Sequence, residues 1–229
     1  MHSRLAGYKP WRLVCVDFPG GKDWGLEQLE TAAGGPAGVT TAPQELRRLP
    51  CVNIAAAIAD TVPRNGEALA VVGHCSTFGL VGGVVRVLRQ RGCRPVGLVV
   101  DPRRVTAASL EEELRIACAT LRGGRPDGFG PAAMTPTALD HWVGDATVLL
   151  RDGAGENPGL SHLSPKTVEQ FVERYRGWFA HLAASSLGEA EDAVSTFPDA
   201  GAARSLLEDA FAVSLPDNPV NRHSNRTKN

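Results

Sequence analysis

The chain has 229 residues, of which 43% are hydrophobic and 21% are charged, and its formal net charge is −1. This length suits one medium domain or two small ones, and 25 glycines with 16 prolines are too few for a fibrous or low-complexity protein. Because the chain has no overall basic charge and no basic stripe interleaved with aromatic residues, we expect no nucleic acid as partner.

The sequence contains no pattern of a secretory or membrane-spanning segment. No apolar run of about 7–15 residues follows the N-terminal residues. Stretches such as Leu69–Val72 are far shorter than the roughly 18 apolar residues that span a bilayer. The five cysteines include no CxxC pair, which favours neither a disulfide framework nor a zinc site. We therefore expect a soluble, cytoplasmic protein without a bound metal or membrane partner.

Short apolar runs rich in branched residues predict the strands. Their hydrophobicity is near-continuous instead of alternating, and helical stretches separate them, as in a parallel sheet that helices cover on both faces. The predicted class is therefore α/β. The runs are Arg12–Asp17, Ala37–Thr41, Ala68–Val72, Pro95–Asp101, Ala146–Arg151 and Ala193–Phe197.

Three helix starts are recognisable. Ser109 and Glu112 have the spacing of a capping box. Ser164 precedes Pro165 at the start of a strongly amphipathic stretch, and a further helix begins near Asp199.

The long excursion at residues 102–145 contains one clear helix and a Gly/Pro-rich stretch, which predicts a lid. We expect one domain over residues 1–215, followed by a frayed tail at residues 216–229.

The segment Ala68–Gly79, ALAVVGHCSTFG, carries the chemistry. It predicts an elbow in which a strand turns sharply into a helix, with the turn residue held above the sheet edge. A glycine two residues earlier relieves crowding there, and the next N–H faces an oxyanion. Gly73 therefore favours Cys75 as nucleophile and Ser76 as oxyanion donor. Thr77 stands where a second glycine is usual, which is a departure from the pattern.

This segment resembles the nucleophile elbow of the α/β-hydrolase-fold thioesterases that work with polyketide synthases and nonribosomal peptide synthetases, with cysteine in place of serine. The likeness extends over most of residues 11–213. Leu13–Gly21 resembles the family's first strand and its Phe-Pro…Gly-Gly loop, which implies that Gly20 or Gly21 supplies a second oxyanion N–H. Gly92–Asp101 resembles the strand that ends in the triad acid, which implies that role for Asp101, and residues 102–145 resemble the lid.

The histidine of the family's triad has no counterpart at its usual place. Ser195–Gly201 resembles the family's last strand and turn, and Ala200 stands where that family has histidine. His162, in the loop after the predicted strand Ala146–Arg151, is the candidate substitute base. Glu156 in the same loop is either an alternative acid or a solvated carboxylate.

The candidate residues also have plain structural interpretations. Cys75 has one as a small buried hydrophobe and Asp101 as a turn residue before Pro102. His181 on the amphipathic helix is expected to be structural. The other cysteines, Cys15, Cys51, Cys93 and Cys118, are expected in the core.

The replacement of serine by cysteine favours acyl transfer. A thiol with the ordinary pKa of about 8.5 is partly ionised at neutral pH, and a helix N-terminus lowers such a pKa further. Transfer of an acyl group through Cys75 to an amine or thiol therefore needs less base catalysis than hydrolysis.

The resemblance implies acyl thioesters on a carrier protein or coenzyme A as substrates, biosynthesis of polyketides or nonribosomal peptides as context, and no bound cofactor. The alternative is an inactive thioesterase-like protein that binds an acyl chain or carrier protein, which the missing histidine and second glycine favour. An editing hydrolase is a third reading.

Overall fold

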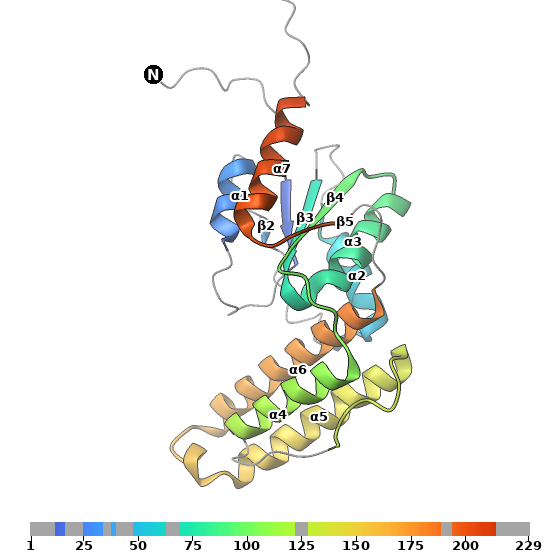
Figure 1. Ribbon diagram of the computed structural model, residues 1–229. Helices are drawn as coiled ribbons and strands as arrows, with labels where there is room; N and C mark the ends of the chain where they lie inside the picture. Colours follow the sequence, from blue (N-terminus) through green and yellow to red (C-terminus); the bar gives the residue numbers. More distant parts are fainter. Residues whose placement is uncertain are drawn as a thin grey trace, which may run out of the picture.

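Figure 1 shows a computed structural model, which describes residues 12–16, 25–33, 38–39, 48–62, 69–121, 128–188 and 194–213. The predicted tail at residues 216–229 and the loop with Gly20 and Gly21 lie outside these ranges.

The described chain has one parallel sheet in the order β2-β1-β3-β4-β5. This order is one of the common doubly wound orders, in which the direction of winding reverses beside the first strand. The sheet confirms the predicted α/β class and every predicted strand except Ala146–Arg151. The strands are β1 (Arg12–Cys15), β2 (Gly38–Val39), β3 (Leu69–His74), β4 (Pro95–Val100) and β5 (Val194–Phe197).

Helices cover both faces of this sheet, and a separate group of helices lies beyond it (Figure 1). Helices α1 (Leu26–Ala33) and α7 (Ala200–Val213) lie on one face, while α2 (Cys51–Asp60) and α3 (Phe78–Gln90) lie on the other. Past the carboxyl end of β4, a bundle forms from α4 (Ala107–Leu121), α5 (Pro136–Glu156) and α6 (Pro165–Leu187). Two short 3₁₀ helices, η2 (Cys75–Thr77) and η3 (Pro158–Leu160), complete the described elements.

The two faces of the sheet belong to two hydrophobic clusters of different size. The smaller cluster joins Leu13, Val72 and Leu98 to Leu29 of α1 and Leu207 of α7. The larger one begins at Val14, Val71 and Val99 on the opposite face and runs without a break through α2 and α3 into the bundle, where Trp142 and Phe179 pack together. The bundle therefore shares its core with the sheet.

The predicted strand Ala146–Arg151 is wrong, because these residues form the middle of α5. The buried residues of this helix recur every three or four positions, which is the period of a helix face packed on a core. That period outweighs the strand preference of a single branched residue such as Val148. The excursion between β4 and β5 is consequently longer than residues 102–145 and consists mainly of α4, α5 and α6.

The helix starts agree with the prediction in two places and differ in one. The Ser164 hydroxyl accepts the N–H of Thr167 at 3.1 Å, and Asp199 accepts that of Ala202 at 2.9 Å. The capping box of α4 lies one turn earlier than predicted, between Thr106 and Ser109.

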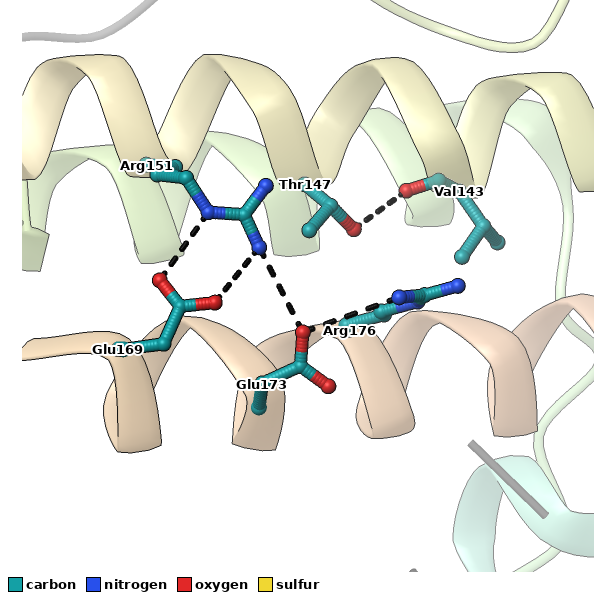
Figure 2. Close-up of polar contacts among 6 residues, drawn as sticks. All are labelled: Val143, Thr147, Arg151, Glu169, Glu173 and Arg176. Carbon is teal, nitrogen blue, oxygen red and sulfur yellow. Dashed lines mark hydrogen bonds and ion pairs between the residues drawn. The ribbon is translucent and has the colours of Figure 1, made fainter. Parts of the chain in front are cut away.

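Ion pairs link α5 to α6 along one side of the bundle (Figure 2). Arg151 donates two hydrogen bonds to Glu169, at 3.1 and 2.7 Å, and lies 3.5 Å from Glu173, which also contacts Arg176. The bond from Arg151 lowers the pKa of Glu169. Bidentate arginine–carboxylate pairs are geometrically specific, so this network sets the register of the two helices more than it adds stability at a partly exposed surface.

The bundle also caps a helix of the sheet layer. Asp140 of α5 accepts the N–H of Cys51, the first residue of α2, at 2.7 Å. No side chain of the preceding Pro50 performs this role. The carboxylate therefore satisfies a helix N-terminus that its own sequence leaves uncapped.

We expect Asp140→Ala to lower the free energy of unfolding by about 0.5–2 kcal/mol, the usual effect of losing an N-cap. Asp145→Ala, an exposed position on the same helix, is the matched control and should change it little. Urea unfolding of both variants measures the difference, and equal effects would contradict the capping role.

Candidate functional site

The chain forms a sharp strand–turn–helix elbow at Cys75. Strand β3 ends at His74, η2 begins at Cys75, and α3 follows directly. Cys75 has φ 55°, a left-handed conformation that is rare for a residue other than glycine. Such strained backbone is characteristic of nucleophile elbows and of functional sites generally.

Gly73 and Thr77 make this turn sterically possible. A β-carbon at residue 73 would overlap the Thr77 hydroxyl and come within 2.6 Å of Val81 Cγ2. Thr77 is buried, and its hydroxyl donates to the carbonyl of His74 at 3.0 Å. The departure noted in the sequence is therefore accommodated, because Thr77 occupies the space that Gly73 leaves open.

The elbow lies at the carboxyl edge of the sheet, where β3 stands between β1 and β4. The chain winds in opposite directions from β1 to β2 and from β1 to β3, so this edge contains the topological switch point. Ligands of open α/β sheets bind at such points. Cys75 is partly exposed there, with its Sγ 3.6 Å from the Ser76 hydroxyl.

Asp101 follows the neighbouring strand at the same edge. His74 and Val100 are paired in register, so Cys75 and Asp101 come next on adjacent strands. Asp101 also has a left-handed backbone, with φ 47°. Its carboxylate is 50% exposed and pairs with Arg103 at 3.2 Å, while the Arg103 N–H donates to the Cys75 carbonyl at 3.0 Å. The structure thus places Asp101 and Arg103 beside the elbow.

His162 and Glu156 lie at the opposite end of the bundle. His162 is exposed just before α6, whereas Ser185, near the end of α6, contacts the elbow. Pro165 and Ser185 are about 30 Å apart along this helix. The expectation that His162 lies above the elbow depended on a strand at Ala146–Arg151. Since these residues are helical and lead away from the sheet, His162 is not brought to Cys75.

The other described histidines have different surroundings. His74 shares a sheet face with Val72, toward α1 and α7, and His141 is exposed on α5. His181 of α6 is buried and stacks on Trp178, with ring centroids 6.0 Å apart. Burial lowers the pKa of His181 to about 4, so the ring is neutral at neutral pH. His181 is therefore a structural residue, as expected from the sequence.

A cavity of about 350 Å³ adjoins the elbow, within the size range of small-molecule sites. Three segments line it: the start of α3 at Phe78 and Gly79, residues 104–106, and the end of α6 at Ser185, Ser186 and Gly188. Arg104 and Ser185 carry no sequence motif that marks them as site residues. Gly79 and Gly188 were the only local signal that another backbone approaches closely here.

The remaining thiols are less accessible or lie elsewhere. Cys15, Cys51 and Cys118 are buried, as expected, while Cys93 is partly exposed after α3. Burial, together with the neighbouring Asp140, raises the pKa of Cys51 to about 12. Within the described ranges, no cluster of three or more potential ligands could hold a metal ion, and no helix is long and apolar enough to cross a membrane.

The tight contact at Gly73 generates a prediction about stability. Gly73→Ala should destabilise the fold by about 1–3 kcal/mol, because the new methyl group overpacks the elbow against Thr77 and Val81. Gly144→Ala on α5 is the control. No atom lies within 4 Å of its added β-carbon, so it should stabilise by about 0.4–1 kcal/mol. Urea unfolding tests this opposite sign, and a stabilising Gly73→Ala would contradict the packing argument.

Burial of His181 predicts a pH-dependent stability. Below its ordinary pKa of about 6.5 the unfolded chain binds a proton that the folded protein excludes down to about pH 4. Stability should therefore be full above pH 6.5 and fall as the pH drops toward 4, by up to about 3 kcal/mol. His181→Phe keeps a ring beside Trp178 and should flatten this dependence in thermal or urea unfolding. The exposed His141→Gln control should retain it, and an unchanged slope in His181→Phe would disprove the assignment.

Comparisons with known proteins assign no family to the chain. No protein-family model matches it, and no curated protein matches it significantly. The choice of function therefore depends on the geometry around Cys75.

Proposed function

We propose that the protein is a thioesterase-like acyltransferase in which Cys75 accepts an acyl group from a thioester and passes it to a second nucleophile. The observation that carries this proposal is the left-handed backbone of Cys75, φ 55°, at the carboxyl edge of the sheet. A β-carbon at this φ is strained, and such strain is typical of nucleophile elbows.

The first step is thiol–thioester exchange. The Cys75 thiolate attacks the carbonyl carbon, a C–S bond to Cys75 forms, and the C–S bond to the leaving thiolate breaks; that thiolate takes up a proton. The N–H of Ser76 would stabilise the oxyanion, together with Gly20 or Gly21 as the resemblance implies. Neither bond broken nor bond formed requires a cofactor.

In the second step an amine or thiol attacks the carbonyl carbon, its bond to that carbon forms, and the C–S bond to Cys75 breaks. The proton that the acceptor loses returns to the Cys75 thiolate. The surroundings of Cys75 favour such an acceptor over water. His162 lies at the far end of α6, and Asp101 pairs with Arg103 instead of a histidine. An amine or thiol attacks an S-acyl group with little base assistance, whereas water needs more. In this proposal Asp101 acts by holding Arg103, whose backbone N–H binds the Cys75 carbonyl.

The cavity beside the elbow favours a thioester with a long, anionic carrier arm. Arg104 is exposed and lines this cavity, and no ion pair of Arg104 is found within the described ranges. A phosphate of coenzyme A or of a carrier protein's prosthetic arm suits this cation. Carrier-bound or coenzyme A thioesters are therefore the proposed substrates, and polyketide or nonribosomal peptide biosynthesis is the context that the sequence resemblance adds.

We also propose the finer fold type. The parallel strands with an elbow after the central strand β3 support an α/β-hydrolase-like core, and the bundle of α4, α5 and α6 at the carboxyl edge takes the position of a lid. In this proposal the lid is longer than residues 102–145.

A second candidate is an inactive relative that binds an acyl chain or carrier protein without turnover. The observation that favours it is the separation of His162 from the elbow. His74 directly precedes Cys75 in the chain, but it shares the sheet face of Val72, toward α1 and α7. It therefore offers no substitute base in this candidate. The two candidates differ in whether Cys75 becomes acylated.

Intact-protein mass spectrometry after exposure to a short acyl thioester tests the proposal. We expect one acyl group per chain in the wild type and in Cys93→Ala, whose thiol is also partly exposed, and none in Cys75→Ala. Adding an amine or thiol acceptor should discharge the acyl group faster than buffer alone.

Three results would count against this function. Acylation that persists in Cys75→Ala rules out Cys75 as the acyl carrier. Absence of acylation from the wild type supports the binding protein instead. Acylation that neither an amine nor a thiol discharges rules out transfer to these acceptors.

A further inference from the structure

The hydroxyl of Ser185, near the end of α6, lies between two backbone groups at the start of α3. The Leu80 N–H donates to Ser185 Oγ at 3.4 Å, and Ser185 Oγ in turn donates to the carbonyl of Ser76. In an uninterrupted α-helix the N–H of residue 80 would bond directly to the carbonyl of residue 76. The side chain of Ser185 therefore replaces the first hydrogen bond of the helix that follows Cys75.

The backbones of the two helices meet at the same place. A β-carbon at Gly79 would collide with the carbonyl oxygen of Ser185, and one at Gly188 would collide with that of Gly79. Glycine at both positions lets the end of α6 press against the first turn of α3. Ser185 itself is only 4% exposed.

This contact controls the orientation of Ser76. The peptide before Ser76 is held by the Arg103 N–H, which donates to the Cys75 carbonyl at 3.0 Å. The peptide after it is held by Ser185 through the Ser76 carbonyl. The Ser76 N–H lies in the first of these planes, together with the Cys75 carbonyl that Arg103 holds. Ser185 holds the second plane, so the backbone of Ser76 is fixed on both sides of its Cα.

We infer that Ser185 is a positioning residue that aims the Ser76 N–H at the oxyanion of a substrate on Cys75. The inference rests on the proposed function, because that N–H matters only if Cys75 attacks a carbonyl group. Without the hydroxyl, the Leu80 N–H and the Ser76 carbonyl are free to bond to each other directly. The turn then closes and the helix is preserved. The peptide that contains the Ser76 carbonyl rotates, and the Ser76 backbone shifts together with its N–H.

Two reactions of the same thiol separate this role from a general structural one. Attack on a thioester develops an oxyanion, whereas alkylation by iodoacetamide displaces iodide and develops none. Loss of a single oxyanion donor typically reduces the rate by about 10²–10³-fold. A donor that is present but points in the wrong direction should reduce the rate less than its complete loss does. The reduction should affect attack on the thioester and leave alkylation by iodoacetamide unchanged.

The experiment compares Ser185→Ala with Ser205→Ala as the matched control. Ser205 is exposed on α7, away from the cavity, and its hydroxyl donates to the carbonyl of Gly201 in its own helix at 3.2 Å. In Ser185→Ala we expect acylation of Cys75 by a short thioester to slow by about 10-fold or more, while alkylation by iodoacetamide stays within about 2-fold of wild type. In Ser205→Ala neither rate should change. Urea unfolding of both variants establishes that they are folded.

The outcomes distinguish this inference from the proposed function. If the wild type is acylated but Ser185→Ala slows both reactions equally, or neither, Ser185 is not a positioning residue and the proposed function stands. If Ser205→Ala produces the same selective loss, the hydroxyl of Ser185 is not responsible. If Cys75 of the wild type reacts with iodoacetamide but not with thioesters, the proposed function fails, and the inference fails with it.

Discussion

The contact between the end of α6 and the first turn of α3 is the constraint on which the rest of the structure depends. Gly79 and Gly188 allow the two backbones to touch, and Ser185 completes the helix turn that follows Cys75. If either glycine carried a side chain, the bundle would have to move away from the sheet. The residues of this contact also line the cavity beside the elbow, so the shape of the cavity depends on how the bundle docks.

The bundle is attached to the elbow at both of its ends. The chain leaves the sheet after β4 at Asp101, where Arg103 binds the Cys75 carbonyl, and it returns through Ser185, which binds the Ser76 carbonyl. Between these points, the cores of bundle and sheet form one hydrophobic cluster. A ligand in the cavity therefore touches segments from both ends of the excursion, and the bundle helps to build the site.

This arrangement is consistent with the proposal that Cys75 works without a histidine base. Cys75 has a strained backbone and a helix N-terminus beside it, and the ion pair of Asp101 and Arg103 follows the neighbouring strand. A thiol needs less activation than a hydroxyl, so these features suit acyl transfer to a nucleophile stronger than water. The surroundings of His181 and Cys51 are different, because both are buried and the Asp140 carboxylate helps to raise the pKa of Cys51.

The amino-acid sequence alone determined the parallel α/β sheet, the helix starts at Ser164 and Asp199, and the elbow at Cys75. Each follows from local rules: apolar runs form strands, capping residues begin helices, and only glycine fits at residue 73. The tertiary structure alone decided that residues 146–151 are helical, that His162 lies far from Cys75, and that Ser185 lies against Ser76. These features depend on which surfaces of α3, α5 and α6 pack together over more than a hundred residues, and no local pattern contains that information.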